Sequence, residues 1–163
     1  MEEALFVVAT IESIYRQHRK GLFTLALSIT GREDSAEDAV HEAIVRLCRS
    51  GKSPTGDPVA YVFAAVRNAA IDQKRKIGSV SIFNLTEPTQ EPSSPVDDRE
   101  RDRIVADAID ELPEDQREAV IMHLYTGLTF QQAAEALGVP LQTIASRYRR
   151  ALARLKEQLA SLK

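Results

Sequence analysis

The fold is decided by the stretch Leu128–Leu159, which runs LTFQQAAEALGVPLQTIASRYRRALARLKEQL. Thr129 and Gln132 have the Thr-x-x-Gln spacing of a capping box, which predicts that a helix begins after Thr129. Gly138 suits a tight turn. Pro140 suits the first turn of a second helix, because a backbone N–H at that position has no partner within the helix, so proline loses nothing by lacking one. The stretch therefore predicts a short helix, a turn and a longer helix.

The longer helix is predicted to be amphipathic. Apolar residues recur at spacings of three and four and predict one buried face, formed by Leu141, Ile144, Tyr148, Leu152, Leu155 and Leu159. The other face is polar and basic, with Arg149 at its flank and Gln142, Thr143, Ser146, Arg147, Arg150 and Arg154 across it. No acidic residue lies between Glu135 and Glu157, so the helix lacks the alternating charges by which a solvated helix gains i,i+4 support. The pattern is typical of the recognition helix of a helix-turn-helix bound to a polyanion, and a solvated arginine-rich bundle face is the alternative.

Composition excludes several classes of protein. The chain has 163 residues, enough for one domain or two small ones, with one cysteine and three scattered histidines. We therefore expect no disulfide, no metal site, no cofactor and no catalytic residues, and hence no enzyme. No apolar run approaches the roughly 20 residues of a membrane span, and the acidic start does not resemble a signal peptide. A cytoplasmic protein without membrane insertion is expected.

The rest of the sequence predicts an all-α fold, because 3.6-residue patterns dominate and strand-like alternation is absent. Two apolar patterns separated by Gly21 predict two helices before Gly31. Later helices are predicted from about Ser35, from Asp57-Pro58 to about Lys76 after the loop Gly51–Gly56, from the run Asp97–Arg103 to Leu112, and from Glu114 to Tyr125.

Charge and proline content divide the chain into three parts. Residues 79–103 contain three prolines and six acidic against three basic residues, which predicts a flexible acidic linker. The modules on either side, residues 1–78 and 104–163, are each nearly neutral, and the whole chain carries −3. Because DNA affinity follows the number of phosphates neutralised, we expect weak binding to DNA unless a larger partner contributes.

The first module has two charged surfaces of opposite sign. Its last helix carries polar and basic residues opposite the apolar stripe, which favours a second contact with the same polyanion: Arg67, Asn68, Asp72, Arg75 and Lys76. A basic helix end also complements the helix dipole without any partner. The preceding helix carries Asp38 and Glu42 four residues apart, with His41 beside them. Like charges at this spacing repel mildly, so we expect a basic or amide-rich partner surface there.

In their order, these segments resemble the extracytoplasmic-function (ECF) sigma factors of bacterial RNA polymerase over essentially the whole chain. The segment Ile29–Glu42 resembles the polymerase-binding part of sigma region 2, and Tyr61–Asp72 resembles the helix that meets melted promoter DNA. The segment Leu112–Ala151 resembles sigma region 4, which recognises the upstream promoter element around −35. The chain departs from the family in having no Trp, in having His41 where Gln is common, and in having Ala145 where Lys is frequent.

The resemblance implies roles for these residues. In region 2, the clamp coiled coil of the largest subunit of core RNA polymerase would contact Asp38, His41 and Glu42. Promoter DNA near the −10 element, where melting starts, would lie along Arg67, Asn68, Asp72, Arg75 and Lys76, and a flipped base would be captured at the loop Gly51–Gly56. In region 4, the major groove and its phosphates would be contacted by Gln142, Thr143, Ser146, Arg147 and Arg150. An anti-sigma factor that covers one or both basic faces is a further implied partner.

Two other functions remain open from the sequence alone. A stand-alone helix-turn-helix regulator would bind operator DNA without polymerase, although no ligand pocket or heptad seam is visible in the first module. A protein-binding helical adaptor descended from a sigma-like chain is the third possibility, and the missing tryptophans motivate it.

Overall fold

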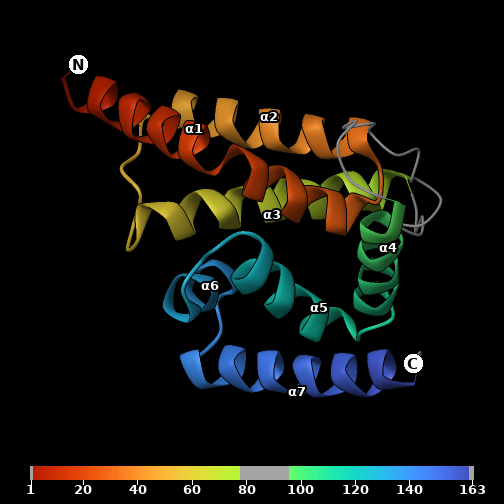
Figure 1. Cartoon of the computed structure of the whole chain (residues 1–163). Helices are drawn as coiled ribbons and strands as arrows, with labels where there is room; N and C mark the ends of the chain where they lie inside the picture. The colour runs from red at the N-terminus through yellow and green to blue at the C-terminus, as the bar shows by residue number, and fades with distance from the viewer. Residues whose placement is uncertain (1, 78–95, 162–163) are drawn as a thin grey trace.

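The structure is a computed structural model that describes residues 2–77 and 96–161. Within these ranges the first module is a bundle of three helices that pack on one another in every pair: α1 (Glu2–Thr30), α2 (Glu33–Ser50) and α3 (Pro58–Ile77). They form one layer of the molecule (Figure 1). Its core consists of fully buried apolar side chains at helical spacing, among them Ile11, Leu22, Leu25, Val62 and Phe63. Asp57 begins α3 as predicted, because its Oδ1 accepts a hydrogen bond of 3.0 Å from the N–H of Ala60.

The second module follows as α4 (Val96–Asp110), α5 (Glu114–Val120), a π-helical segment η2 (Ile121–Tyr125), α6 (Phe130–Leu137) and α7 (Leu141–Ala160). In Figure 1, α7 runs along the bottom of the molecule with α5 and α6 between it and the first module, while α4 stands at one side. Val120, Met122, Leu128, Ile144 and Ala151 of this module belong to one hydrophobic core together with the buried residues of the first module. The prediction of two all-helical modules is confirmed.

The predicted linker lies mostly outside the described residues, which resume at Val96. Residues 79–95 of the predicted linker are not among the residues that the structure describes. The remaining residues, 96–103, form the first half of α4, in agreement with the expectation that the charged run 97–103 begins a helix.

Gly21 does not separate two helices, so that prediction is wrong. The helix α1 continues through it without a break. A glycine inside a helix costs about 0.5–1 kcal/mol relative to alanine, which is the reason for expecting a break there. The structure shows what the absent side chain permits: a Cβ at this position would lie 3.2 Å from the Cβ of Thr126 and 3.5 Å from the ring of Phe63. Gly21 therefore allows the second module to approach α1 closely.

The buried face of α7 also differs from the prediction. Leu141 and Leu152 are 46% and 41% exposed, whereas Ala151 is fully buried. The buried residues of α7 are instead Ile144, Ala151 and Leu155, on a helix that packs against α5. An alanine contributes little to a hydrophobic pattern, so the sequence favoured the neighbouring leucine.

The helix predicted over Glu114–Tyr125 is present but widens in its second half. The N–H of Thr126 donates to the carbonyl of Ile121, five residues earlier, over 3.0 Å. Such π-helical turns are rare and insert one extra residue per turn, which rotates the following side chains. Leu124 and Tyr125 are consequently 57% and 47% exposed.

Candidate nucleic-acid interface

The turn between α6 and α7 has the geometry that the sequence predicts. The Thr129 hydroxyl oxygen accepts from the N–H of Gln132 at 3.1 Å, and the Gln132 Oε1 accepts from the N–H of Thr129 at 3.0 Å. Both halves of the capping box are therefore formed. Gly138 ends α6 in the left-handed region at φ 69°, where a side chain would be strained. The two helices pack together as a helix-turn-helix.

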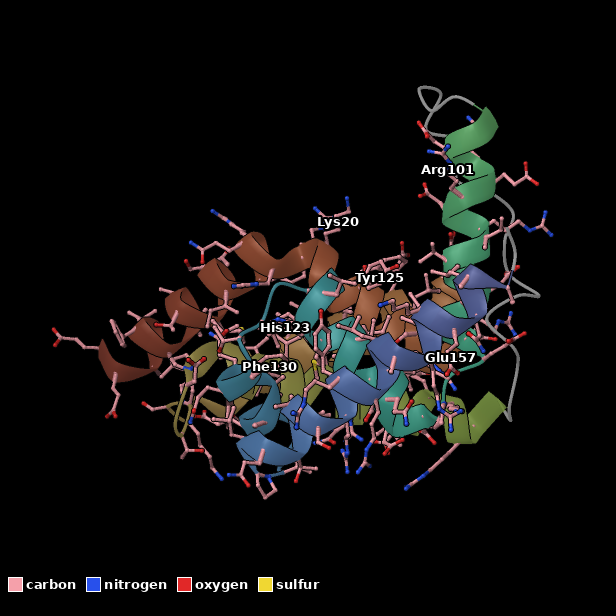
Figure 2. The ribbon with its side chains drawn as sticks, turned by 60° about the horizontal axis from the view of Figure 1, so that its bottom comes forward. Lys20, Arg101, His123, Tyr125, Phe130 and Glu157 are labelled. Atoms are coloured by element: carbon pink, nitrogen blue, oxygen red, sulfur yellow. The ribbon has the colours of Figure 1, made fainter. Side chains whose placement is uncertain are left out.

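Three aromatic rings hold the helix-turn-helix together. The rings of His123 and Phe130 are stacked with centroids 4.0 Å apart, and Tyr148 meets each of them edge-on at 4.9 and 5.2 Å. The His123 Nδ1 donates a hydrogen bond of 2.8 Å to the carbonyl of Leu128. Figure 2 shows His123 and Phe130 where η2, α6 and α7 meet. The cluster thus joins η2, α6 and α7 through side-chain contacts.

Replacing Phe130 by alanine is expected to lower the free energy of unfolding of the second module by about 2 kcal/mol. The expected loss of stability is smaller than for a fully buried phenylalanine because Phe130 is half-buried. It arises in part from the two ring contacts that the substitution removes, with His123 and Tyr148. Chemical denaturation of the full chain followed by circular dichroism measures it. Phe6→Ala is the matched control, because Phe6 is 72% exposed on α1. Equal stabilities of the two variants would contradict a structural role for the ring cluster.

The predicted DNA-facing residues of α7 fall into two groups. Gln142 and Arg150 are exposed, whereas Thr143, Ser146 and Arg147 are half-buried. Arg147 has an acidic partner inside the chain, because its Nε lies 3.6 Å from an oxygen of Asp115 on α5. The sequence favoured an external negative partner for the arginines of α7, and for Arg147 the structure shows an acidic partner within the chain.

The predicted DNA-facing residues of α3 are likewise divided. Asn68, Asp72, Arg75 and Lys76 are exposed along the helix. Arg67 instead forms an ion pair with Glu118 of α5: its Nε donates to one carboxylate oxygen at 2.8 Å, and its Nη2 donates to the other at 3.4 Å. The two side chains are 26% and 12% exposed. The structure thus places Arg67 between the modules, apart from the other four residues.

The acidic surface of α2 borders a groove that the sequence did not predict. Asp38 and His41 are exposed, and Glu42 is half-buried with an ion pair of 2.7 Å to Arg46, one turn further along α2. The groove between α1 and α2 has a volume of about 760 Å³ and is lined by Tyr15, Arg16, Gln17, Arg19, Lys20, Phe23, Glu37, Asp38, Val40 and His41. Lys20 extends from α1 away from the helical body (Figure 2). The surface around Asp38 and His41 therefore combines acidic, basic and aromatic groups.

Cys48 has the environment of a packing residue. It is half-buried against the core of the first module. Burial raises the pKa of its thiol, and the nearby Glu12 carboxylate raises it further. Because the thiolate is the reactive form, a raised pKa lowers reactivity at neutral pH.

Over residues 2–77 and 96–161, no three His, Cys, Asp or Glu side chains are grouped so that they could hold a metal ion. No helix in that part of the chain has the length and apolar character needed to cross a membrane.

Comparison with protein families gives two matches in the same order as the two modules. Residues 14–79 match the model of Sigma-70 region 2, and residues 102–155 match that of Sigma-70, region 4. The helix-turn-helix is therefore the second of two sigma regions, which disfavours a stand-alone regulator.

Several curated ECF RNA polymerase sigma factors are similar in sequence. EcfG of Rhodopseudomonas palustris is 30% identical over 148 residues, which cover 85% of this chain and 78% of EcfG. SigL of Mycobacterium tuberculosis is 29% identical over 94% of this chain and 91% of its own length. SigE of Mycolicibacterium smegmatis is also 29% identical, over 91% of this chain, but the match spans only 61% of SigE.

Solved structures of sigma factors have a similar fold. The sigma factor RpoE from Bartonella quintana, solved in complex with the anti-sigma factor NepR, gives a TM-score of 0.68 at 26% identity and covers 91% of this chain and 96% of its own. CnrH, solved with the cytosolic domain of CnrY, gives a TM-score of 0.71 at 20% identity, which supports the fold alone, over 98% and 96% of the two chains. With two sigma regions in order and a 30% identical relative aligned over most of both chains, this protein belongs to the ECF family of RNA polymerase sigma factors.

Proposed function

We propose that this chain directs core RNA polymerase to specific promoters and thereby starts transcription. The observation that carries the proposal is the ordered pair of sigma regions, residues 14–79 and 102–155, on one chain. A protein with both regions can contact a promoter at two separated elements. In this assignment, residues 1–78 act as region 2, residues 79–103 as the linker and residues 104–163 as region 4.

Region 4 would recognise the −35 element through α7. An α-helix fits the major groove of B-DNA, where each base pair has its own pattern of donors and acceptors. Exposed Gln142 and Arg150 are the side chains best placed to contact base edges or phosphates directly, and Thr143 and Ser146 would add shorter polar contacts. Arg147 would first have to leave Asp115, which reduces its net gain from a phosphate.

Region 2 would bind polymerase and the −10 element on different helices. Asp38, His41 and the groove beside them would receive the clamp coiled coil of the largest subunit. On α3, DNA near the start of melting would meet the exposed row Asn68, Asp72, Arg75 and Lys76. The loop Gly51–Gly56 would accommodate an unstacked base.

Two partner proteins are proposed, one from the net charge of the chain and one from the solved structure of a relative. A chain of net charge −3 neutralises few phosphates by itself, so most of the affinity for a promoter would come from the polymerase complex. Because RpoE of Bartonella quintana was solved with an anti-sigma factor, we further propose that a protein of this kind inhibits the present chain. Polymerase and chromosome share the bacterial cytoplasm, so the proposed function implies a cytoplasmic, non-enzymatic subunit.

A binding experiment separates this function from a stand-alone regulator. Sigma-free core polymerase is mixed with the purified chain, and complex formation is followed by gel filtration and native mass spectrometry. We expect a complex of one chain per polymerase and weak binding of the chain alone to duplex DNA. Absence of a complex together with tight, sequence-specific binding of the chain alone would support the regulator instead.

A further inference from the structure

The ion pair between Arg147 and Asp115 lies inside the second module, on the helix proposed to contact DNA. The Nε of Arg147 is 3.6 Å from an oxygen of Asp115, and the two side chains are 26% and 53% exposed. Arg147 shares its face of α7 with Thr143, one turn before it, and with Arg150, one turn after it. The guanidinium of Arg147 is thus held beside α5, whereas the neighbouring Arg150 is exposed.

Asp115 is held at the start of α5 by interactions of its own. Its Oδ1 accepts a hydrogen bond of 2.9 Å from the N–H of Gln116, while its Oδ2 lies towards Arg147. An acidic residue in the first turn of a helix is also stabilised by the helix dipole. These two interactions hold Asp115 in place whether or not Arg147 is bound to it. Its carboxylate therefore remains beside the face of α7 that would meet DNA.

The Asp115 carboxylate and a DNA phosphate compete for the same guanidinium. Both are anionic, and both offer oxygen acceptors to the N–H donors of an arginine. A phosphate that binds Arg147 must displace Asp115, so its net gain is the difference between the two interactions. An ion pair as exposed as this one changes an equilibrium by about fivefold at most. Asp115 should therefore tune the affinity for DNA rather than prevent binding.

We propose that Asp115 limits the sequence-independent affinity of the second module for DNA, because it withholds one phosphate contact of Arg147. This inference rests on the proposed function, since it uses the DNA-binding role assigned to α7. Phosphate contacts strengthen binding to every sequence, whereas base contacts distinguish one sequence from another. With Arg147 held, base contacts by neighbours such as Gln142 supply a larger share of the affinity. Upstream elements that fit poorly then stay below the affinity needed for initiation.

The test measures binding of the full chain to a labelled duplex DNA of mixed sequence, by fluorescence anisotropy over a salt series. Asp115→Asn removes the charge but keeps an oxygen that can accept from the N–H of Gln116. Glu157→Gln is the matched control, because it removes the same charge from an exposed position further along α7 (Figure 2). Arg147→Ala, alone and combined with Asp115→Asn, completes a double-mutant cycle. Circular dichroism checks that each variant is folded.

We expect Asp115→Asn to bind the mixed-sequence duplex about threefold more tightly than wild type, and to steepen the slope of log affinity against log salt by about one. Glu157→Gln should change neither quantity by a comparable amount. Asp115→Asn should give little gain when residue 147 is already alanine, because the gain comes from the released guanidinium. In initiation assays with polymerase, Asp115→Asn should use start sites whose upstream element matches less well than those used by wild type.

Several results would overturn the inference. An equal gain from Glu157→Gln, or an equal gain from Asp115→Asn with and without Arg147, would reduce the effect to net charge. Weaker binding by Asp115→Asn would mean that Asp115 orients Arg147 for DNA instead of withholding it. An unchanged affinity in a variant that still supports initiation would reject the inference and leave the proposed function intact. If the wild-type chain initiates nowhere with polymerase, the proposed function fails, and the duplex measurements still decide the role of Asp115.

Discussion

Replacing Arg150 by alanine is expected to weaken promoter binding by the polymerase complex about tenfold, and to reduce the slope of log affinity against log salt by about one. Arg150 is exposed on α7, on the face that carries Gln142 and Ser146. Each phosphate that a side chain neutralises releases condensed counterions, so losing one contact lowers the salt dependence by a fixed step. Filter binding or anisotropy over a salt series measures both quantities.

The control for Arg150 is Lys156→Ala, which removes a positive charge from an exposed position further along α7, away from the helix-turn-helix turn. It should leave the affinity and the slope nearly unchanged. Arg147→Ala should have a smaller effect than Arg150→Ala, because Arg147 is already paired with Asp115. An unchanged slope in Arg150→Ala, or equal effects of Arg150→Ala and Lys156→Ala, would contradict the assignment of this face to DNA.

The second large effect is expected at the polymerase surface. Asp38→Ala combined with Glu42→Ala should weaken association with core polymerase by about tenfold or more, because charged partners across a protein interface set both its orientation and its rate of formation. Asp38 is exposed, and Glu42 is half-buried with its carboxylate paired to Arg46 at the surface, so the fold should survive. Competition for core polymerase against a labelled wild-type chain measures the loss, and circular dichroism checks the fold.

The matched control for this pair removes two acidic residues elsewhere. Glu114→Ala combined with Glu157→Ala changes the net charge by the same amount at exposed positions of α5 and α7. We expect this control to compete as well as wild type. Full association of the Asp38 and Glu42 variant would remove the case for a polymerase contact on α2.

Local signals in the sequence predicted most of the fold. The capping box at Thr129, the turn at Gly138 and the cap at Asp57 act within three or four residues, so their geometry follows from spacing alone. The errors arise where tertiary packing overrides a local preference. Gly21 lies inside a continuous helix, where a Cβ would press on Thr126, and Ala151 is buried while Leu152 is exposed on a helix that packs against α5.

The candidate site was predictable in its residue types but not in its partners. Spacing placed Asn68, Asp72, Arg75 and Arg150 on exposed faces, and the structure agrees. The partner of Arg67 lies 51 residues away, and no periodic pattern encodes such a pairing. The only signal was a group of acidic residues on the helix that precedes the helix-turn-helix, Glu114, Asp115 and Glu118, which hinted at a basic neighbour without identifying it.

The central claim is that one chain contacts a promoter at two elements while holding polymerase, and the most direct measurement is initiation itself. Purified protein, sigma-free core polymerase and a library of genomic fragments are incubated with nucleotides, and the 5′ ends of the RNA products are sequenced. The account predicts start sites that depend on the added protein and share two upstream sequence elements at a fixed spacing. RNA that starts without a shared element, or no initiated RNA from any fragment, would contradict it.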